Sequence, residues 1–464
     1  MLDSTATLQV QEVLDTLNDA FASGDVDRIT ELFATECYWR DLVAMTWNLK
    51  TVEGRDAVAD MLTSQMGEVA PGGFAIQDGE IPVEEDGVTT AWITFETAVG
   101  RGWGLMRLKD GRIWTLLTAL QELKGFEENR GTRRPMGAEH GAAKNRKSWK
   151  EKREAEAAEL GYTEQPYTVI IGGGQGGIAL GARLRQLGVP TIVLDKHDRP
   201  GDQWRSRYKA LTLPDPVWYD HMPYMPFPEF WPLFTPKDKM GDWLVAYAQA
   251  LELSVWTGPE CLGVARPPSG EGWTVTLKRG DETVTLSPAH LVMAVGNAGF
   301  PRTPEIEGQA DLAGVQMHSS HFASGEGLAG KRVIVVGANN SAHDIAADLA
   351  GHGAHPVMIQ RSSTMVVRQS TVVETLLGPL FSQAAVERGV TTERADLMLA
   401  ASPFRAQEAS APALWARVRE QEAAFYDRLE AAGFALDFGE DGTGMLKYPR
   451  TASGYYFDVG ACEM

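Results

Sequence analysis

Apolar residues near the amino terminus recur at steps of three and four positions. Leu8, Val13, Leu17 and Phe21 follow this spacing, and the segment 23–25 (SGD) then interrupts it before Ile29. A glycine turn between two stretches of helical period predicts two helices joined by a short connection.

Strand-like patterns follow. Gly87–Phe95, Trp103–Leu108 and Ile113–Leu120 are rich in β-branched and aromatic residues, and the dipeptide 110–111 (DG) separates the last two. Asp-Gly between such runs is typical of a tight hairpin. Residues 1–125 are therefore predicted to form a small α+β domain.

A charged stretch, 126–165, comes next and contains almost no large apolar residues. It predicts a linker that is partly helical. The basic run Lys144–Arg153 could be a recognition tag, but acidic residues follow it directly, which favours a solvated helix face.

From Tyr167 onward short β-branched runs alternate with glycine turns and helical stretches, as in a parallel sheet. In the segment 167–188 (YTVIIGGGQGGIALGARLRQLG) Gly172, Gly174 and Gly177 follow a strand and open a helix. This is the dinucleotide-binding pattern, in which the glycines permit a tight turn, an approach to the pyrophosphate and close helix packing. A second strand ends at Asp195, where a carboxylate accepts ribose hydroxyls and disfavours a 2′-phosphate.

A second unit, 331–353, repeats strand, turn and helix with a degraded pattern. Gly337 holds the first position, whereas Asn339 and Ala342 replace the later glycines. Asparagine tolerates left-handed backbone better than other non-glycine residues. Arg361 follows the second strand of this unit, at the position that Asp195 has in the first unit. Its guanidinium can bind a 2′-phosphate through two hydrogen bonds, although a surface ion pair is the alternative interpretation. The candidate binding residues here are Gly337, Asn339, Ser341, Arg361 and Ser362.

Two unlike nucleotide sites predict electron transfer from NADPH to FAD. The predicted fold class is therefore α/β, with two Rossmann-like domains, an FAD-binding one at 166–328 and an NADP-binding one at 329–464, after the small α+β domain.

The composition of the whole chain excludes some classes of binding partner. A formal charge of −19 over 464 residues disfavours nucleic acid and anionic membranes, and no apolar run spans a bilayer. The amino terminus is acidic and lacks a secretory pattern. The scattered Cys37, Cys261 and Cys462 give neither a disulfide framework nor a metal site. We expect a cytoplasmic protein, with a homodimer left open.

The region after Tyr167 resembles the flavin-containing monooxygenases, especially their YUCCA-like branch. The run 199–208 (RPGDQWRSRY) is similar to the family's GGxW segment through Trp204, although Asp202 replaces a glycine. The segment 291–308 resembles its ATG turn through Gly296. The segment 312–322 (LAGVQMHSSHF) fits the identifying pattern FxGxxxHxxx(Y/F) through Gly314, His318 and Phe322, with Leu312 in place of the opening Phe.

The resemblance implies an oxidoreductase in which NADPH reduces FAD and dioxygen is captured as a flavin hydroperoxide. One oxygen atom then passes to a small organic substrate. Phe322 stands where Baeyer–Villiger relatives carry Trp, which favours heteroatom or YUCCA-type oxygenation. His318 is the one candidate for a catalytic role, and the resemblance implies that this role is organisational. The alternatives are a flavin reductase or NADPH oxidase that releases hydrogen peroxide, and a non-catalytic binding or assembly module that uses the first domain. A disulfide reductase is disfavoured because no close cysteine pair is present.

The first domain resembles the NTF2-like, or SnoaL-like, cone proteins through its element order, the segment 38–41 (YWRD) and its closing strand. Trp39, Asp41 and Trp47 are candidates for lining a pocket. Since no histidine precedes His140, acid–base chemistry in the cone is disfavoured.

The resemblance also implies a return to the FAD domain after the NADP domain, through a late strand, a turn and a helix. After Phe434–Phe438 no such pattern is recognised. The sequence is therefore expected to be a fragment, and the identity of the substrate is not readable from it.

Overall fold

The computed structural model describes residues 5–138, 140–142, 144–297 and 299–464. The chain divides into two compact units. The first contains the residues up to Glu127 together with Gly378–Arg417, and the second contains Glu128–Leu377 together with Val418–Met464. Each unit is described by itself.

The first unit is built on a mixed sheet. Its order is β2-β1-β7-β6-β5-β3, β4 also pairs with β5, and only β1 and β7 run parallel. The elements are α1 (Thr5–Ser23), α2 (Val26–Glu31), β1 (Phe33–Leu42), β2 (Leu49–Glu53), α3 (Arg55–Val69), β3 (Gly72–Ile76), β4 (Val83–Glu85), β5 (Val88–Glu96), β6 (Gly100–Lys109), β7 (Arg112–Leu123), α10 (Gln383–Glu387), α11 (Thr392–Ala400) and the first part of α12 (Phe404–Gln421).

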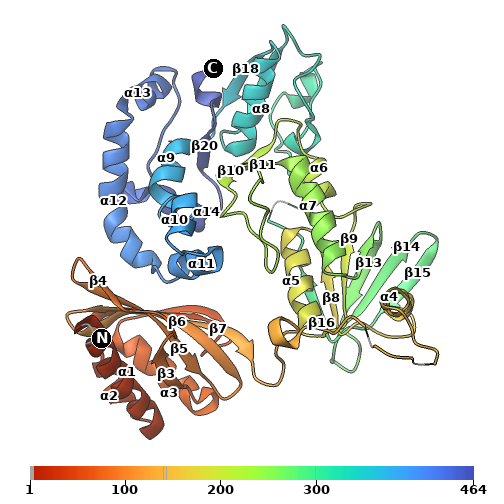
Figure 1. Ribbon diagram of the computed structural model, residues 1–464. Helices are drawn as coiled ribbons and strands as arrows, with labels where there is room; N and C mark the ends of the chain where they lie inside the picture. The colour runs from red at the N-terminus through yellow and green to blue at the C-terminus, as the bar shows by residue number, and fades with distance from the viewer. Residues whose placement is uncertain (1–4, 139, 143, 298) are drawn as a thin grey trace. The chain divides into compact units, whose positions relative to one another are not determined.

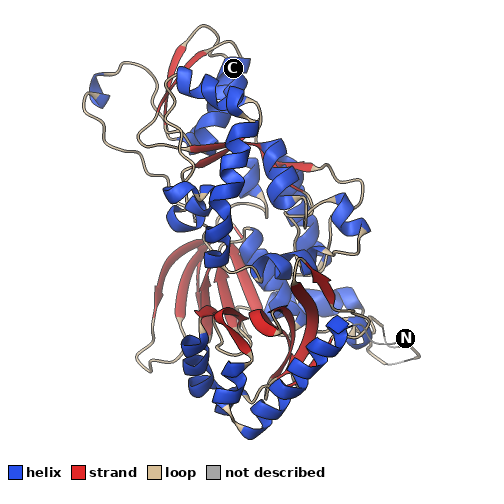
Figure 2. Ribbon diagram, turned by 90° about the vertical axis from the view of Figure 1, so that its left-hand side faces the viewer, coloured by secondary structure: helices blue, strands red, loops and turns tan. Residues whose placement is uncertain are grey.

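Helices α1, α2 and α3 cover one face of this sheet (Figure 1), which is strongly curved (Figure 2). The core between them is aromatic. The rings of Phe21 and Phe74 stack at 5.3 Å, and those of Phe74 and Phe95 stack at 5.5 Å. Offset stacking of buried rings adds to the free energy gained from their burial, so this face is closed by packed side chains.

The predicted pair of amino-terminal helices and the three strands with their hairpin are confirmed as α1, α2, β5, β6 and β7. The hairpin residues Asp110 and Gly111 both have positive φ, as a primed turn requires. Strand β1 and helix α3 were not predicted. The helical spacing of Ile29 and Leu32 also predicts Phe33 as part of the second helix. Phe33 instead begins β1, where its ring packs on Trp39 at 5.7 Å inside the sheet core.

The other face of the same sheet is covered by the segment 378–417. Leu397, Met398 and Ala401 pack against Leu105 and Leu117. The guanidinium of Arg107 donates to the carbonyl of Ala401 at 2.9 Å.

Arg394 strengthens this contact, since it forms an ion pair with Glu80 at 2.7 Å and lies 5.0 Å from the ring centre of Trp92. The predicted division keeps 378–417 within the NADP domain 329–464, whereas the compact units join it to the amino-terminal domain. The physical reason is the apolar strip on the outer sheet face, which helix α11 removes from water.

The second unit contains two groups of parallel strands joined by helices and irregular loops. Its elements are η1 (Gly131–Arg133), α4 (Trp149–Glu159), β8 (Thr168–Ile171), α5 (Gln175–Gln186), β9 (Thr191–Asp195), α6 (Asp202–Arg205), β10 (Thr212–Pro216), β11 (Phe234–Pro236), α7 (Lys237–Ala250), β12 (Val255–Thr257), β13 (Glu260–Ala265), β14 (Thr274–Arg279), β15 (Glu282–Leu286), β16 (His290–Met293), η2 (Gln309–Asp311), η3 (Ser319–His321), β17 (Arg332–Val336), α8 (Asn340–Gly351), β18 (His355–Ile359), β19 (Met365–Arg368), α9 (Gln369–Thr371), η4 (Val372–Leu377), the end of α12, α13 (Ala423–Ala431), η5 (Glu440–Gly442), η6 (Gly444–Leu446), α14 (Lys447–Thr451), β20 (Tyr455–Asp458) and η7 (Ala461–Glu463).

The first parallel sheet has the order β12-β9-β8-β16, and the antiparallel meander β13-β14-β15 lies beside it in sequence. Val169 and Ile192 are fully buried in its core, together with Trp256. These β-branched strands are apolar on both faces, as expected for a covered parallel sheet.

The second parallel pair is β17-β18, with α8 packed on it through Ile345 and Leu349. A third pair, β19-β20, is also parallel. The sequence showed no recognisable strand, turn and helix after Phe434–Phe438, but the structure does form a strand there, β20 at Tyr455–Asp458, which pairs with β19. Tyr456 in this strand stacks on His343 of α8 at 4.0 Å, a tertiary contact that the sequence pattern does not reveal.

The spacing of Leu414, Val418, Phe425 and Leu429 predicts one helix at Pro412–Ala432, with Pro near its start and Gly433 past its end. The structure differs. Helix α12 begins at Phe404, so Pro412 lies inside it, and α13 follows after Glu422. Gly433, with φ of +85°, lies beyond the end of α13 as predicted.

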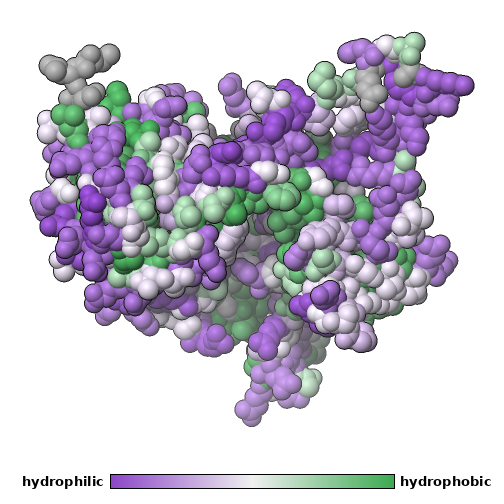
Figure 3. Space-filling view, turned by 90° about the horizontal axis from the view of Figure 1, so that it is seen from below, coloured by the Kyte–Doolittle hydropathy of each residue, from purple (hydrophilic) through white to green (hydrophobic). Residues whose placement is uncertain are grey.

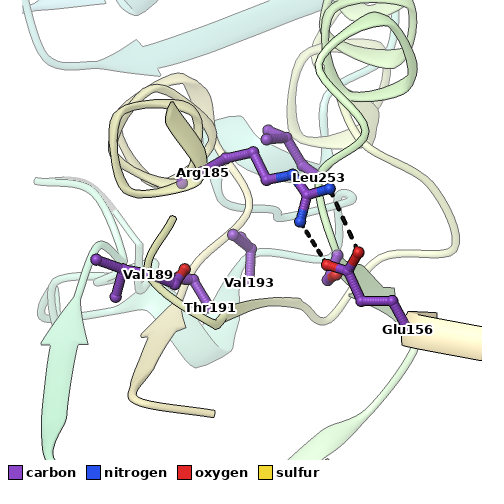
Figure 4. Close-up of a pocket in the computed structure, with 8 residues that line it drawn as sticks. Glu156, Arg185, Val189, Thr191, Val193 and Leu253 are labelled. Atoms are coloured by element: carbon purple, nitrogen blue, oxygen red, sulfur yellow. Dashed lines mark hydrogen bonds and ion pairs between the residues drawn. The ribbon is translucent and has the colours of Figure 1, made fainter. Parts of the chain in front are cut away.

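The charged linker is docked on the second unit through α4. Glu156 on α4 and Arg185 on α5 form an ion pair beside a cavity of about 20 Å³ (Figure 4), which is room for about one water molecule. Arg153 forms a second ion pair, with Glu252, at 3.2 Å. No residue of α4 is buried, in agreement with the interpretation of this helix as a solvated face.

Hydrophilic residues cover much of the face seen in Figure 3, and apolar residues lie between them in separate groups. Within the described residues no helix is long and apolar enough to cross a membrane.

Candidate functional site

The first glycine turn connects β8 to α5 and is held by close backbone contacts. Gly172 has φ of +115°, and a Cβ there would lie 2.2 Å from the carbonyl oxygen of Ala294. A Cβ on Gly177 would lie 1.9 Å from the carbonyl oxygen of Gly172. A side chain at Gly172 would clash with the segment after β16, and one at Gly177 would clash with the turn itself, so both positions require glycine.

Gly174 has a different environment. It is the N-cap of α5 in extended backbone, and among the described residues the one atom near its missing Cβ is Nε2 of Gln203, at 3.5 Å. Both polar atoms of the Gln203 amide are buried and lack a hydrogen-bond partner within the described chain, as does the indole nitrogen of Trp204. A buried amide without a partner in the described chain, beside the N-terminus of a helix, fits contact with a bound phosphate or flavin group.

Asp195 ends β9 beside this turn, and its side chain is 5% exposed. Its Oδ1 accepts the backbone N–H of His197 at 3.0 Å and lies 2.9 Å from Nδ1 of the same residue. Its Oδ2 faces Gly173, where a Cβ would lie 2.6 Å away. The strand therefore delivers a fixed carboxylate to the edge at which the glycine turn lies.

The second turn, between β17 and α8, has the same backbone form. Gly337 has φ of +128°, close to that of Gly172. Asn339 is the N-cap of α8 with φ of −103°, so the left-handed backbone invoked for it is wrong, and its extended conformation suits any residue. The Cβ of Ala342 lies 3.8 Å from the position of a Cβ on Gly337, which shows that α8 leaves room for alanine.

Polar groups surround the second turn. Oδ1 of Asn340 is buried without a partner in the described chain, and Oγ of Ser341 lies 3.5 Å from a guanidinium nitrogen of Arg207. Arg361 and Ser362 follow β18 and are exposed. The structure thus brings the turn and the exposed guanidinium to the carboxyl ends of two paired strands.

The remaining candidates lie further from the turns. Gly296 is exposed after β16, with φ of +77°. His318 is the N-cap of η3, and its Nδ1 accepts the backbone N–H of Ser320 at 3.1 Å. Phe322 is 8% exposed and packs in the same cluster as Ile345 of α8. Phe322 thus packs the segment against α8, and His318 caps the short helix that precedes it.

The aromatic loop between α6 and α7 contains two half-buried acids that the sequence did not single out. Burial raises the pKa of Asp215 to about 6. Burial, together with the charge of Asp215, raises the pKa of Asp220 to about 8. Asp215 lies between two prolines in β10, and only the folded loop shows that these carboxyl groups are removed from water.

Because the pKa values of these two acids are raised in the folded state, we expect the free energy of unfolding to fall as the pH rises. An exposed carboxyl in the unfolded chain titrates near pH 4, so between about pH 4 and pH 8 the folded state binds more protons than the unfolded state. We expect Asp220→Asn to flatten this dependence and to stabilise the protein at pH 8 by on the order of 2 kcal/mol. Denaturant unfolding midpoints of both proteins, measured from pH 5 to pH 8, give the pH dependence of stability. Asp281→Asn, at an exposed hairpin, is the control, and an unchanged slope in Asp220→Asn would contradict the assignment.

In the first domain, the residues predicted to line a pocket stabilise the fold instead. The Asp41 carboxylate is fully buried and accepts the backbone N–H groups of Ala44, Met45 and Thr46 and the hydroxyl of Thr118. Trp39 is also buried and donates its indole N–H to that hydroxyl at 2.9 Å, whereas Trp47 is 58% exposed. These three residues therefore do not line a common pocket.

The three cysteines are free in the structure. Within the described chain no group of three His, Cys, Asp or Glu side chains is arranged to hold a metal ion.

Two domain families match this chain. Residues 169–402 match the family described as pyridine nucleotide-disulphide oxidoreductase, and residues 14–116 match the SnoaL-like domain. The first match covers both glycine turns and the exposed Arg361. The second covers most of the curved sheet.

Curated relatives include indole-3-pyruvate monooxygenase YUCCA1 of Oryza sativa subsp. japonica, which is 37% identical over 212 residues. The aligned region is 46% of this chain and 52% of the relative. The probable indole-3-pyruvate monooxygenase YUCCA8 of Arabidopsis thaliana is 37% identical over 205 residues, covering 43% and 48%. The chain thus spans about half the length of the curated relatives it matches.

Among solved structures, the flavin-containing monooxygenase from Stenotrophomonas maltophilia superimposes with a TM-score of 0.41 and 27% identity, over 48% of this chain and 68% of that one. The S-allyl-L-cysteine S-oxygenase from Allium sativum gives a TM-score of 0.40 and 24% identity, over 43% and 52%.

The YUCCA relatives confirm the predicted resemblance to flavin monooxygenases, and the SnoaL-like match confirms that of the first domain. With the family match extending over half of its length, from β8 to the end of α11, this chain belongs to the pyridine nucleotide-disulphide oxidoreductase family.

Proposed function

We propose that this chain binds FAD at the first turn and NADPH at the second, and acts in an NADPH- and oxygen-dependent monooxygenation. One atom of dioxygen enters a small organic substrate and the other leaves as water. The observation that carries the proposal is the pair of strand–turn–helix units with matching glycine backbone, one followed by the buried Asp195 and the other by the exposed Arg361.

The FAD site is proposed to use the space over Gly174. The N–H groups at the start of α5 face this space, the Gln203 amide and Trp204 indole offer unpaired polar atoms, and Asp195 accepts ribose hydroxyls. When bound, FAD supplies hydride acceptance from NADPH and activation of dioxygen.

An apolar wall beside the first turn supports this use. The rings of Phe227, Trp231 and Trp243 lie 4.9 to 5.3 Å apart, and Trp204 packs in the same cluster as Trp243. An aromatic wall of half-buried rings would help to exclude water from the redox reaction, where stray proton donors would waste reducing equivalents as hydrogen peroxide.

The proposed substrate is defined only as a small organic molecule. The curated relatives are named for indole-3-pyruvate, a keto acid, but they match this chain over only part of their length. A small organic acid, amine or sulfide is consistent with the family chemistry, and the shape of the pocket decides among them.

The purified protein tests the proposal directly. We expect a bound flavin with visible absorbance that bleaches when NADPH is added without oxygen and returns when air is admitted. Product containing one added oxygen atom per NADPH supports the monooxygenase, whereas equimolar hydrogen peroxide with no oxygenated product favours the oxidase. A colourless protein that never consumes NADPH would refute both.

Arg361 is predicted to select NADPH over NADH. Arg361→Ala should leave the flavin bound and raise the KM for NADPH by about tenfold to a hundredfold, the effect of losing charge-assisted hydrogen bonds to a phosphate. The KM for NADH should change little. Arg332→Ala, another exposed arginine, on β17, is the matched control. Equal losses for NADH and NADPH would show that Arg361 does not read the 2′-phosphate.

A further inference from the structure

A short segment after α6 makes side-chain contacts with the elements of the second turn. Arg207 reaches Ser341 at the start of α8. Lys209 forms an ion pair with Glu326 at 2.6 Å, and its backbone N–H donates to Ala323 at 2.8 Å. Arg207 therefore contacts α8, and Lys209 contacts the loop that precedes β17.

Tyr208 is the buried member of this segment. It is 2% exposed, and its ring packs with Phe322, Ala342 and Leu349 in one apolar cluster. Its hydroxyl donates to Oδ2 of Asp344 at 2.5 Å, about one turn into α8. Burial raises the pKa of Asp344, and the hydrogen bond from Tyr208 opposes this rise by stabilising the carboxylate.

The other end of the same segment lies at the first turn. Gln203 is five residues before Tyr208, and its amide lies beside Gly174. Helix α6 holds Gln203 in place, because Arg205 donates to the carbonyl of Pro200 at 3.0 Å and pairs with Asp242 at 2.7 Å. The chain between Gln203 and Tyr208 therefore joins the two glycine turns by a short and well-anchored path.

We propose that the Tyr208–Asp344 hydrogen bond positions the second nucleotide turn relative to the first. Tyr208 and Asp344 are positioning residues, which act through α8 and through the segment that carries Gln203. The inference rests on the proposed function, because it concerns two nucleotides held in register for hydride transfer. The glycine patterns alone do not indicate this connection between the two sites.

The test removes the hydroxyl and keeps the ring. In Tyr208→Phe we expect flavin absorbance to be retained, NADP⁺ binding measured by titration calorimetry to weaken about fivefold to twentyfold, and flavin reduction at saturating NADPH to slow about tenfold. Amide exchange in the first turns of α8 should also speed up, a readout that does not depend on turnover.

The control is a second buried tyrosine. Tyr247 is fully buried, and its hydroxyl donates to the carbonyl of Pro223 at 2.8 Å without reaching α8. Tyr247→Phe should lower the unfolding midpoint as much as Tyr208→Phe and leave NADP⁺ binding unchanged. Asp344→Asn keeps an acceptor for Tyr208 and should resemble the unaltered protein, whereas Asp344→Leu should resemble Tyr208→Phe.

The outcomes separate the two claims. If the unaltered protein binds flavin and NADP⁺ while Tyr208→Phe loses only thermal stability, the positioning role is wrong and the proposed function stands. If the unaltered protein binds neither nucleotide, the proposed function fails and the positioning role fails with it.

Discussion

Gly174→Val is expected to yield a folded protein without bound flavin. The valine side chain would enter the space over the N-terminus of α5, where the one described atom within 4 Å of the new Cβ is Nε2 of Gln203. The backbone of Gly174, with φ of −74°, accepts an L-residue. The added methyl groups would enter the place proposed for a phosphate and press on the flexible amide of Gln203, and we expect FAD affinity to fall by at least about a hundredfold.

Visible absorbance after purification, and fluorescence titration of added FAD, measure this loss. Gly176→Ala is the matched control, because Gly176 lies in the first turn of α5, and a Cβ there meets no described atom within 4 Å. Circular dichroism should show both variants folded. If Gly174→Val purifies with a full complement of flavin, the FAD site has been placed at the wrong turn.

The glycine turns were predictable because their backbone form is dictated locally. A positive φ and a close carbonyl contact leave room for nothing but glycine at Gly172, and the same strand, turn and helix order marks Gly337. The degraded second pattern also has a local explanation, since Asn339 adopts extended backbone and α8 accommodates Ala342.

The docking of the segment 378–417 on the amino-terminal sheet was not predictable from periodicity. Arg394 is separated from Glu80 by more than three hundred positions, and the helical spacing of α11 indicates an apolar face without naming what covers it. The same holds for Tyr208 and Asp344. Each is an unremarkable residue in sequence, and their pairing exists only because the flavin-side segment folds onto α8.

In the cone domain, Asp41 was predicted to line a pocket, but in the structure it stabilises the loop that follows β1. The segment 38–41 does place Trp39 and Asp41 inside the domain. Sequence could not show that the carboxylate would be satisfied by the following residues, because the donors are backbone N–H groups, which carry no residue signature.

Asp41→Ala is therefore expected to destabilise the first unit by about 3–5 kcal/mol. The change removes the acceptor shared by the N–H groups of Ala44, Met45 and Thr46 and by the Thr118 hydroxyl, and leaves buried donors unpaired. Chemical denaturation measures it, with Asp19→Ala, at an exposed position on α1, as a control expected to change stability by less than about 0.5 kcal/mol.

The same variant separates the two roles considered for the cone. Because Asp41 belongs to the first unit and both glycine turns belong to the second, Asp41→Ala should retain its flavin and its NADP⁺ affinity under conditions where the protein remains folded. A variant with unaltered stability that loses catalytic turnover would instead show that the carboxylate acts on substrate. The hydrogen bonds around Asp41 argue against that result, since they engage both of its oxygens from within the domain.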